Sequence, residues 1–514
     1  MTTDDCHYLM DGDGYRRSLR DGRRIFYRGE LIEDVTTHPA TSGGIDLLAE
    51  AYDAQFDPDL RDVLTFVRPD GARVSKAWLI PRSRDDLRSR RACVEHLARR
   101  TFGIFGRQMD MIATTQIGMA ANLELFRQHS PEYAENILPY IDYAAEGNLI
   151  LAAPVADPQG WRSRGSALGR RGVPLFDETK AAAIRNDELG LRIGDHVIPG
   201  ALQVVRESDE GLWISGAKIV ATVAPQGHEM VVSNIALPDP SPEGSLWALV
   251  PVGAEGVRLV CRETTALPDA AFHDHPIASR GDEADAVVLF EEVFVPRWRV
   301  HSYRWTDIGK HYGDIGTLEH WHTLTRICVK AELFVGLLQL ITDGIGTSHR
   351  DGVRQLTAEV MEYASVLRGM VLASEEQATY TASGVLWPDK RMITAGRAYA
   401  LGRYPHIVHI VRELAGQGPV LRWSEADFDN PEVGPWLEWA YEGAAISARD
   451  KNLLMNLLWD LTSGSHAGRV SLFENVNGFP VPYLRIRVYN EFDRAGAVDA
   501  IKDYLGLDAA GEQP

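Results

Sequence analysis

The apolar run Leu246-Trp247-Ala248-Leu249-Val250 is followed closely by a second run, Val257-Arg258-Leu259-Val260, and the interval between them contains Pro251, Gly253 and Gly256. Short apolar runs that are separated by turn residues, at intervals of about ten residues, are typical of strands in a sandwich or a barrel. The pattern continues over residues 148–300, in the runs Leu149–Ala153, Leu191–Ile193, Ala201–Val205, Leu212–Ile214, Glu229–Val232 and Ala286–Phe290. The sequence therefore predicts a central β domain, which we expect to be an antiparallel β-barrel.

Both flanks of this region show helical periodicity. On the N-terminal side, the apolar positions of Asp86–Ala113 predict one helix, and a second is expected to end at Pro131, because the residue before a proline disfavours the helical conformation. Arg61–Phe66 and Ala72–Ile80 are expected to form short strands. On the C-terminal side, four largely apolar stretches predict a helical bundle, namely Leu324–Ile345, Gln355–Gln377, Tyr404–Leu414 and Ile446–Leu461.

Three domains follow from this reading: a mainly helical domain over residues 1–147, the β-barrel over 148–300, and a helical bundle with a tail over 301–514. A chain of 514 residues is too long for one compact core, which agrees with several domains. This α+β order resembles the acyl-CoA dehydrogenase architecture, in which a flavin lies between the β domain and the bundle. An architecture by itself does not determine an activity.

Composition and charge argue against several classes of partner. The formal net charge is −19, so phosphate backbones and anionic lipid surfaces are expected to repel the chain, and we expect neither a nucleic-acid nor a membrane partner. The segment Met1–Met10 has no apolar core of a secretory signal, and no run approaches the roughly 20 apolar residues that span a bilayer. Four scattered cysteines indicate a reduced, cytoplasmic protein; they are Cys6, Cys93, Cys261 and Cys328.

Familiar nucleotide and metal motifs are missing from the sequence. No Gly-x-Gly-x-x-Gly follows a predicted strand and no Walker A loop occurs, so the chain is not expected to bind a nicotinamide cofactor or ATP in the usual ways. Three histidines precede the first bundle helix, at His311, His320 and His322, with Glu319 at a matching offset. A metal site, ordinary core or surface histidines, and a proton-transfer histidine in a pocket stay open as interpretations. We expect no metal.

An ordered set of short motifs resembles the oxygenase component of the 4-hydroxyphenylacetate 3-monooxygenase family, nearly from end to end. The motifs of the first domain are Ser18–Arg23, Asp34–Pro39, Arg61–Thr65, Ile80–Ser83, and Phe102-Gly103 with Gly106-Arg107. Those of the β domain are Asp157–Gln159, Ser215–Lys218 with Ala221-Thr222, Ser279-Arg280 and Phe290–Pro296. Those of the bundle are Arg326, Val329–Glu332, Trp459–Leu461 and Gly468-Arg469. No single motif is decisive, but their order and spacing together are specific.

The resemblance implies a two-component monooxygenase. Reduced FAD would come from a separate NAD(P)H-flavin reductase, oxygen would be the co-substrate, and one oxygen atom would enter an aromatic or heteroaromatic small molecule through a flavin C4a-hydroperoxide. Such a species needs a dry pocket and a hydrogen bond near the flavin N5. The resemblance also implies a homotetramer, or a dimer, built on bundle contacts, and it explains why a nicotinamide fingerprint is missing.

The resemblance assigns cofactor roles to two segments and a single threonine. Thr222 matches the family's flavin-contacting threonine, and otherwise it would be an ordinary strand residue. Asp157-Pro158-Gln159 matches a loop that passes along the isoalloxazine, and otherwise it would be a turn between domains. Gly468-Arg469 matches a segment near the FAD phosphates, where backbone amides and a guanidinium suit a pyrophosphate. Its alternative is a helix cap with a solvated arginine.

The substrate pocket is where this chain departs from the family. Arg107 matches the family's substrate-facing arginine, which could stabilise a phenolate, although a surface arginine is the alternative. The family's substrate tyrosine and histidine correspond to Met111 and Ala153. The position of a histidine in chlorophenol-type relatives corresponds to Trp321 in this sequence. If the match is shifted by one residue, His320 or His322 would be the base instead. The pocket is therefore expected to be more apolar, so that simple 4-hydroxyphenylacetate is disfavoured and an indole, a polycyclic or a carrier-bound ring is favoured.

Two other functions remain open at this stage. An acyl-CoA dehydrogenase or oxidase would share the architecture, and it would need a carboxylate base in the bundle, for which Glu359, Glu362 and Glu442 are available. The second is a flavin-binding relative that has lost oxygenation, a possibility raised by Met111 and Ala153. The sequence names neither the substrate nor the choice between hydroxylation, epoxidation and rearrangement.

Overall fold

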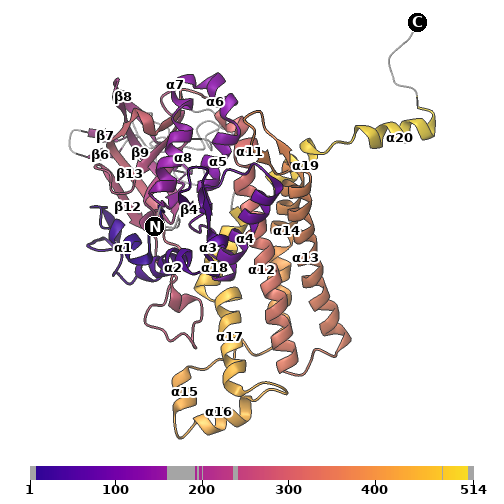
Figure 1. Ribbon diagram of the computed structural model, residues 1–514. Coiled ribbons are helices and arrows are strands. Elements are labelled where there is room, and N and C mark those ends of the chain that lie inside the picture. The colour runs from indigo at the N-terminus through magenta and orange to yellow at the C-terminus, as the bar shows by residue number, and fades with distance from the viewer. Residues whose placement is uncertain are drawn as a thin grey trace, which may run out of the picture.

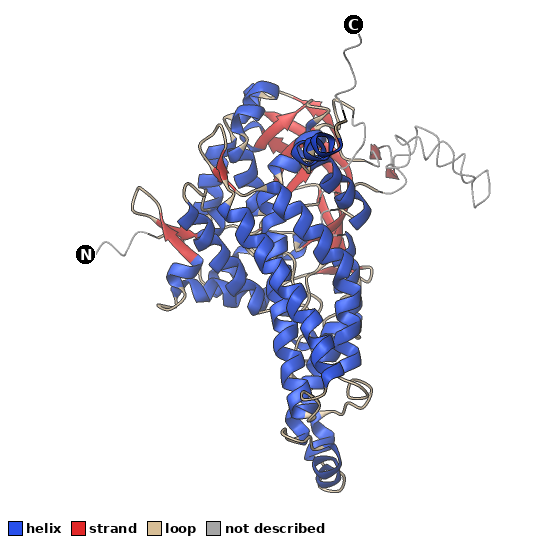
Figure 2. Cartoon of the chain, turned by 90° about the vertical axis from the view of Figure 1, so that its right-hand side faces the viewer, coloured by secondary structure: helices blue, strands red, loops and turns tan. Residues whose placement is uncertain are grey.

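The structure is a computed structural model, and it describes residues 7–154, 156–158, 191–193, 196–198, 201–234, 241–476 and 479–507. In Figure 1 most of the strands lie on the left, the N-terminal helices α4, α5 and α8 lie in the middle, and the long helical bundle lies on the right. The bundle extends well beyond the strands at one end (Figure 2). The predicted mixture of helical and β regions is therefore confirmed.

The β layer consists of two main sheets rather than one closed barrel. The first has the strand order β2-β1-β12-β13-β9-β8 and the second has the order β14-β11-β10-β5. Within the described ranges both sheets are open, so the predicted closed, purely antiparallel barrel is corrected. The pairs β1–β12 and β10–β5 are parallel. The bounds are β1 Ile25–Tyr27, β2 Glu30–Ile32, β5 Leu151–Ala152, β8 Gln203–Glu207, β9 Gly211–Thr222, β10 Glu229–Ser233, β11 Leu246–Pro251, β12 Val257–Cys261, β13 Asp285–Pro296 and β14 Val300–Tyr303.

Each of the eight predicted apolar runs contains or overlaps a strand, including β6 (Leu191–Ile193), which pairs with β7 (His196–Ile198). The reason is that these runs are rich in apolar residues that favour strands, and a strand in a sheet buries one of its faces or both. Two strands of the larger sheet, β1 and β2, come from the N-terminal segment that was predicted to be mainly helical. That segment is therefore part of the β layer as well as of the helical layer.

The predicted helix over Asp86–Ala113 is broken in the structure. Helix α4 ends at Arg99, and Phe102 and Gly103 both adopt left-handed backbone conformations, with φ of 51° and 63°. The Gly103 amide then donates to the Ala98 carbonyl at 2.7 Å. Periodicity could not detect this break, because the apolar spacing continues through a turn that also buries its side chains. Residues 104–112 therefore form an irregular segment rather than a helix.

The other N-terminal helices lie on either side of this segment. Their bounds are α1 Gly12–Ser18, α2 Ser42–Asp53, α3 Arg61–Leu64, α4 Arg84–Arg99, α5 Ala113–Ala121, α6 Leu123–His129, α7 Pro131–Ala134 and α8 Ile137–Glu146. The strands expected over Arg61–Phe66 and Ala72–Ile80 are reduced to β3 (Thr65–Val67) and β4 (Arg73–Ser75), and helix α3 occupies most of the first stretch. The predicted helix boundary at Pro131 is confirmed, since α6 ends at His129 and Pro131 begins α7.

Four long helices form the bundle, as predicted: α12 Thr317–Gly344, α13 Asp351–Glu376, α14 Lys390–Leu414 and α17 Ala448–Thr462. The short helix α11 (Tyr312–Ile315) leads into α12, and β15 (Thr379–Tyr380) pairs with β16 (Leu386–Trp387) between α13 and α14. At the far tip of the bundle lie α15 (Glu425–Asp429) and α16 (Gly434–Tyr441), and beyond α17 follow α18 (Ser465–Val476), α19 (Val481–Glu491) and α20 (Ala495–Leu505) (Figure 1). Of the helices in the described residues, none is both long and apolar enough to cross a membrane.

Candidate active site

Two carboxylates, the buried Glu283 and the half-buried Asp285, join the bundle to the larger sheet. The Arg469 guanidinium, on α18, donates to Glu283 at 2.6 Å and to both oxygens of Asp285 at 2.9–3.1 Å. Burial alone would raise the pKa of Asp285, but the charges of Arg469 and Arg262 overcome that effect and lower it. The Arg469 side chain therefore remains charged and is tied to carboxylates at the seam between α18 and the start of β13.

Thr222 belongs to the same network. It is the register partner of Asp285 where β9 pairs with β13, and its hydroxyl donates to the Asp285 carboxylate at 2.6 Å. The residue is almost completely buried. Because the hydroxyl proton is used in that bond, the oxygen presents only lone pairs to any further partner. Thr222 is thus oriented as a hydrogen-bond acceptor.

Arg107 lies in the irregular segment that follows α4 and reaches this network through its backbone. Its amide donates to the second oxygen of Glu283, the carboxylate that also binds Arg469. Its guanidinium lies 3.4 Å from the Met111 sulfur and 5.5 Å from the centre of the Phe473 ring. The sequence placed Arg107 and Met111 on one helical face; the structure brings them together on a loop instead.

The Phe473 ring is in contact with several cations. The guanidiniums of Arg107, Arg326 and Arg469 lie 4.7–5.9 Å from its centre. The ring also fills the space beside Gly106, where a Cβ atom would lie only 2.3 Å from it. A glycine is therefore required at position 106 for the loop that carries Arg107 to approach α18 this closely.

A fully buried ion cluster supports this ring from α12. Glu474 accepts two hydrogen bonds from the Arg326 guanidinium, at 2.7 and 3.0 Å, and it also pairs with Lys330. Burial would raise the pKa of Glu474, but the two cations lower it to about 2. Burial lowers the pKa of Lys330 to about 8. The cluster holds the last turn of α18, and with it Phe473, against the bundle.

The Asp157–Pro158 turn is attached to β9. The Lys218 ammonium donates to the Asp157 carboxylate at 2.7 Å, and both side chains are fully buried. The Ile219 amide also donates to the Ala156 carbonyl at 2.8 Å. The Asp157 side chain thus anchors the loop, while Pro158 is half-buried beside it; Gln159 lies outside the described residues. Ala153, just before this turn, is half-buried and packs against the hydrophobic cluster that contains Met111.

The two predicted histidines of α12 have different surroundings. The His322 ring is 3.0 Å from the Asp110 carboxylate, so it ties α12 to the segment that precedes Met111. The His320 ring packs edge-on against Tyr312 and Phe479, with centroids 5.9 and 6.3 Å apart, and burial lowers its pKa well below the usual value. Trp321, between them, is completely buried.

The beginning of α18 adjoins the Arg469 network. His466 is buried, its Nδ1 lies 3.1 Å from the Thr265 hydroxyl, and its Nε2 meets no hydrogen-bond partner among the described residues. Gly468 is exposed, and a Cβ atom there would have no atom of the described chain within 4 Å. The first-turn amides of a helix lack intrahelical acceptors. Open space, the amides of a helix N-terminus and a half-buried guanidinium therefore adjoin one another here.

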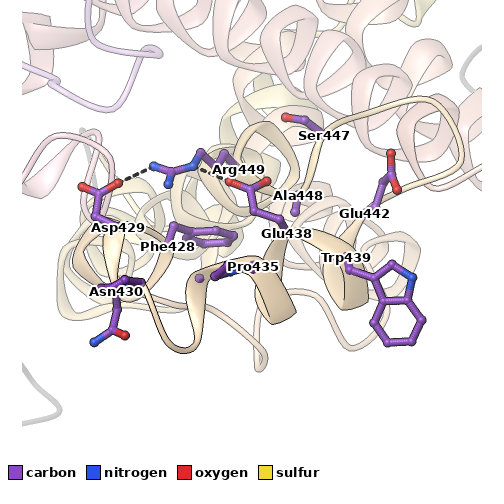
Figure 3. A pocket seen from close by; sticks show the side chains of 12 residues that line it. Phe428, Asp429, Asn430, Pro435, Glu438, Trp439, Glu442, Ser447, Ala448 and Arg449 are labelled. Carbon is purple, nitrogen blue, oxygen red and sulfur yellow. Dashed lines mark hydrogen bonds and ion pairs between the residues drawn. The ribbon is translucent and has the colours of Figure 1, made fainter.

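Other candidate positions lie apart from this seam. Glu359 pairs with His406 at 3.0 Å on the bundle surface, and Glu362 and Glu442 are exposed, so none of the three adjoins Thr222 or Arg107. Within the described residues, no group of three His, Cys, Asp or Glu side chains is arranged to hold a metal. An open cavity of about 780 Å³ lies at the far tip between α15, α16 and α17, where Arg449 pairs with Asp429 and Glu438 (Figure 3).

The sequence did not indicate the side chains that bind the predicted site residues and hold them together. Glu283 and Asp285 precede and begin β13, and Phe473 and Glu474 follow Arg469 by one turn of α18. None belongs to a recognisable motif. A carboxylate flanking a strand is usually solvated, and only the tertiary structure places these two beside guanidiniums. The one available signal was the close spacing of Asp282, Glu283 and Asp285 before an apolar run.

Comparisons with known proteins agree with this architecture. The 4-hydroxyphenylacetate 3-hydroxylase N-terminal family matches residues 11–171 and 195–301, and the C-terminal family matches residues 312–506. The chain is 32% identical over 494 residues, 93% of its length and 87% of the relative's, to the oxygenase component of 4-nitrophenol 4-monooxygenase/4-nitrocatechol 2-monooxygenase from Rhodococcus opacus. It is 30% identical over 516 residues, 98% of its length and 94% of the relative's, to an FADH2-dependent monooxygenase of Burkholderia cepacia.

A solved structure confirms the likeness in three dimensions. The oxygenase component of 4-hydroxyphenylacetate 3-monooxygenase, complexed with FAD and 4-hydroxyphenylacetate, superposes with a TM-score of 0.86 and 28% identity, over 97% of this chain and 98% of that one. The matched families together span most of the sequence. The chain therefore belongs to the 4-hydroxyphenylacetate 3-hydroxylase family, which its N-terminal and C-terminal halves both match.

Proposed function

We propose that this protein is the oxygenase component of a two-component monooxygenase, which takes reduced FAD from a separate reductase and inserts one atom of O2 into an aromatic small molecule. The observation that carries the proposal is the partly buried network in which Asp285 and Glu283 connect Thr222, Arg469 and Arg107. These three residues come from β9, α18 and the loop after α4. A flavin site at a seam between sheet and bundle needs such a connection.

The residues at the seam fit reduced FAD chemically. Thr222 donates to Asp285, so its oxygen can only accept a hydrogen bond, which suits the N5–H that reduced flavin carries and oxidised flavin lacks. The first-turn amides of α18 and the open space at Gly468 suit a phosphate, with the Arg469 charge nearby. When bound, reduced FAD supplies the activation of O2 and the transfer of one oxygen atom.

The protein's own residues then have distinct tasks. Thr222 accepts a hydrogen bond at a fixed point, because Asp285 holds its hydroxyl. Arg107 presents a half-buried guanidinium that can stabilise an oxyanion on the substrate, and its backbone is held by Glu283. Met111 and Ala153 line the adjoining apolar cluster and make it poor in polar groups. This composition supports an aromatic substrate other than simple 4-hydroxyphenylacetate.

We also propose a homo-oligomer, most simply a tetramer, that works in the cytoplasm. Helix α20 extends away from the rest of the chain (Figure 1) and buries none of its residues. Its apolar side chains are strongly exposed, with Ile501 at 60% and Tyr504 at 90%. Exposed apolar surface of this kind is covered by a partner in stable proteins. A second copy of the chain, which brings its own α20, is the partner that symmetry favours.

The experiment that tests the function is stopped-flow absorbance. The protein is loaded with FADH2 without oxygen and is then mixed with O2, with free FADH2 as the control. A transient that differs from both reduced and oxidised flavin and outlasts the control would support a monooxygenase. Direct formation of oxidised FAD and peroxide, both alone and with a panel of phenols and indoles, would instead support a flavin-binding relative without oxygenation.

A further inference from the structure

The far tip of the bundle carries an aromatic surface that the proposed flavin site does not use. Helix α16 exposes Trp436 and Trp439 at 69% and 74%, and Val433, just before the helix, is exposed as well. These three residues follow one another at intervals of three, so they lie on one side of the helix. We call them the tip face. They adjoin the open cavity between α15, α16 and α17, which Trp439 helps to line (Figure 3).

The tip face is additional to the small core that holds the tip together. That core consists of Phe428, Tyr441 and Ala448, and Trp423 and Leu437 pack against it. The ring of Trp423 meets that of Tyr441 edge-on at 4.6 Å. Helix α16 therefore has two apolar sides, one of which already packs inside the chain. The other bears the two tryptophans, and apolar surface of this kind marks a site of protein contact.

The C-terminal helix α20 has a matching apolar stripe. Val498, Ile501 and Tyr504 also follow at intervals of three, and all three are exposed. With 11 residues, α20 is about 16 Å long, which is enough to cross a helix of the length of α16. The two surfaces lie at opposite ends of the bundle, α20 beyond α19 at one end and α16 at the other (Figure 1). Within one chain they are too far apart to meet.

We infer that α20 of one copy packs on the tip face of a second copy, and that the second copy's α20 packs on the tip face of the first. A two-fold axis across the bundle reverses its direction, so it brings each arm to the partner's tip. Such an interface repeats the same contact twice, and both apolar surfaces become covered together. The inference rests on the proposed homo-oligomer and deepens it, because it names the surfaces that join the copies.

Charge argues against the alternative in which two tips meet each other. Residues 425–442 contain no lysine or arginine, so two tips would bring like charges together, which disfavours a contact. Their carboxylates are Glu425, Asp427, Asp429, Glu432, Glu438 and Glu442. Helix α20 is balanced instead, because Lys502 and the preceding Arg494 accompany Asp499 and Asp503. A contact between two α20 helices alone would leave both tryptophans of each tip in water.

Cross-linking between differently marked copies tests the inference. Chains with Trp439→Cys and chains with Ile501→Cys carry different affinity tags, are co-expressed, and are treated with a short bis-maleimide. We expect a covalent dimer that carries both tags, and each variant expressed alone should stay at the background of the unmodified chain with its four cysteines. Val67→Cys, at an exposed position of β3 outside the bundle, replaces Trp439→Cys in the control and should give no mixed dimer.

Three results would overturn the inference. A dimer from Ile501→Cys alone would indicate that two α20 helices pair, and a dimer from Trp439→Cys alone would indicate that two tips pair. No mixed dimer above the Val67→Cys control would leave the tip to a different partner, such as a basic protein. Light scattering on the unmodified protein keeps these results separate from the homo-oligomer proposal. A single-copy protein would end both proposals, whereas an oligomer without the mixed dimer would end only this one.

A combination of changes tests the same contact without a cross-linker. Trp436→Ser together with Trp439→Ser should weaken self-association by about tenfold or more, because truncated tryptophans at an interface centre cost the most. Deletion after Glu491 should have a similar effect, and the combined change should add little, because both remove one contact. Light scattering over a range of concentrations measures this, with circular dichroism to verify folding. Losses that add fully would place α20 and the tip face in separate interfaces and contradict the inference.

Discussion

Thr222 and Asp285 face each other as register partners on adjacent strands, and the threonine hydroxyl donates to the carboxylate at 2.6 Å. The same carboxylate binds the Arg469 guanidinium, so one residue of β13 orients both a strand hydroxyl and a bundle cation. The β9–β13 pairing therefore places Thr222, and the contact between α18 and the sheet helps to orient its hydroxyl through Asp285.

The first prediction concerns this hydroxyl. Thr222→Val keeps the branched shape but removes the acceptor proposed for the reduced flavin. The fraction of FADH2 oxidation that yields peroxide should therefore rise. The transient after oxygen mixing should decay about tenfold faster, which corresponds to a decrease of about 1.4 kcal/mol in the activation free energy of its decay. Thr222→Ser retains the oxygen and should largely restore the lifetime. If Val and Ser behave alike, the hydroxyl has no part in oxygen chemistry.

The second prediction concerns the buried cluster around Glu474. Glu474→Gln leaves the Arg326 and Lys330 charges uncompensated in the interior, which should cost about 3–5 kcal/mol in the free energy of unfolding. Denaturant unfolding measures the effect, and Glu413→Gln, at an exposed position of α14, is the control with the same chemical change. An equal, small loss in both variants would show that the cluster does not stabilise the fold.

A pH dependence follows from the same group. The pKa of Glu474 is about 2 in the folded protein and is expected to be near the ordinary value of 4.5 in the unfolded chain. A depressed pKa adds stability that is fully present above 4.5 and is lost as the pH falls toward 2, a contribution on the order of 3 kcal/mol. Unfolding free energies between pH 7 and pH 3 should therefore decline less steeply in Glu474→Gln than in the unmodified protein.

The third prediction concerns Gly106. A Cβ atom at this position would collide with the Phe473 ring, so Gly106→Ala should cost about 1–3 kcal/mol of stability and should weaken ligand binding through the displaced Arg107 loop. Gly369→Ala, on α13, has open space and should raise the stability by up to about 1 kcal/mol, because alanine favours a helix. Thermal unfolding of the two variants side by side measures the contrast. Similar melting temperatures would mean that Phe473 moves aside freely.

The fourth prediction concerns α20. Deletion of the chain after Glu491 removes the apolar arm and should reduce the molecular mass of the assembly in light scattering, because the exposed faces of Ile501 and Tyr504 would no longer be covered. A milder change, Ile501→Asp, should act in the same direction, whereas Lys502→Asp, one position along the helix, provides the control for charge. An unchanged assembly in all three variants would assign α20 another role.

Much of the architecture follows from local patterns. The apolar runs between residues 148 and 300 correspond to strands, and the four long helices of the bundle were predicted from 3.6-residue periodicity, because burial of one face imposes a period that can be read in the chain. Closure of the sheets could not be predicted in this way. Strand order depends on which edges meet, and β1 joins the larger sheet from more than 200 residues away in sequence.

In the candidate site, what the sequence determined and what the tertiary structure decided can be distinguished more clearly than in the fold. The sequence by itself determined the family, and its resemblance to that family singled out Thr222, Arg107 and Arg469. Only the tertiary structure decided that Glu283 and Asp285 bind all three, and that Tyr312 packs against the hydrophobic cluster that contains Met111. The physical reason is that a lone carboxylate or tyrosine has no periodic signature. Its chemistry depends on burial and on charged partners from distant segments, and these exist only once the chain has folded.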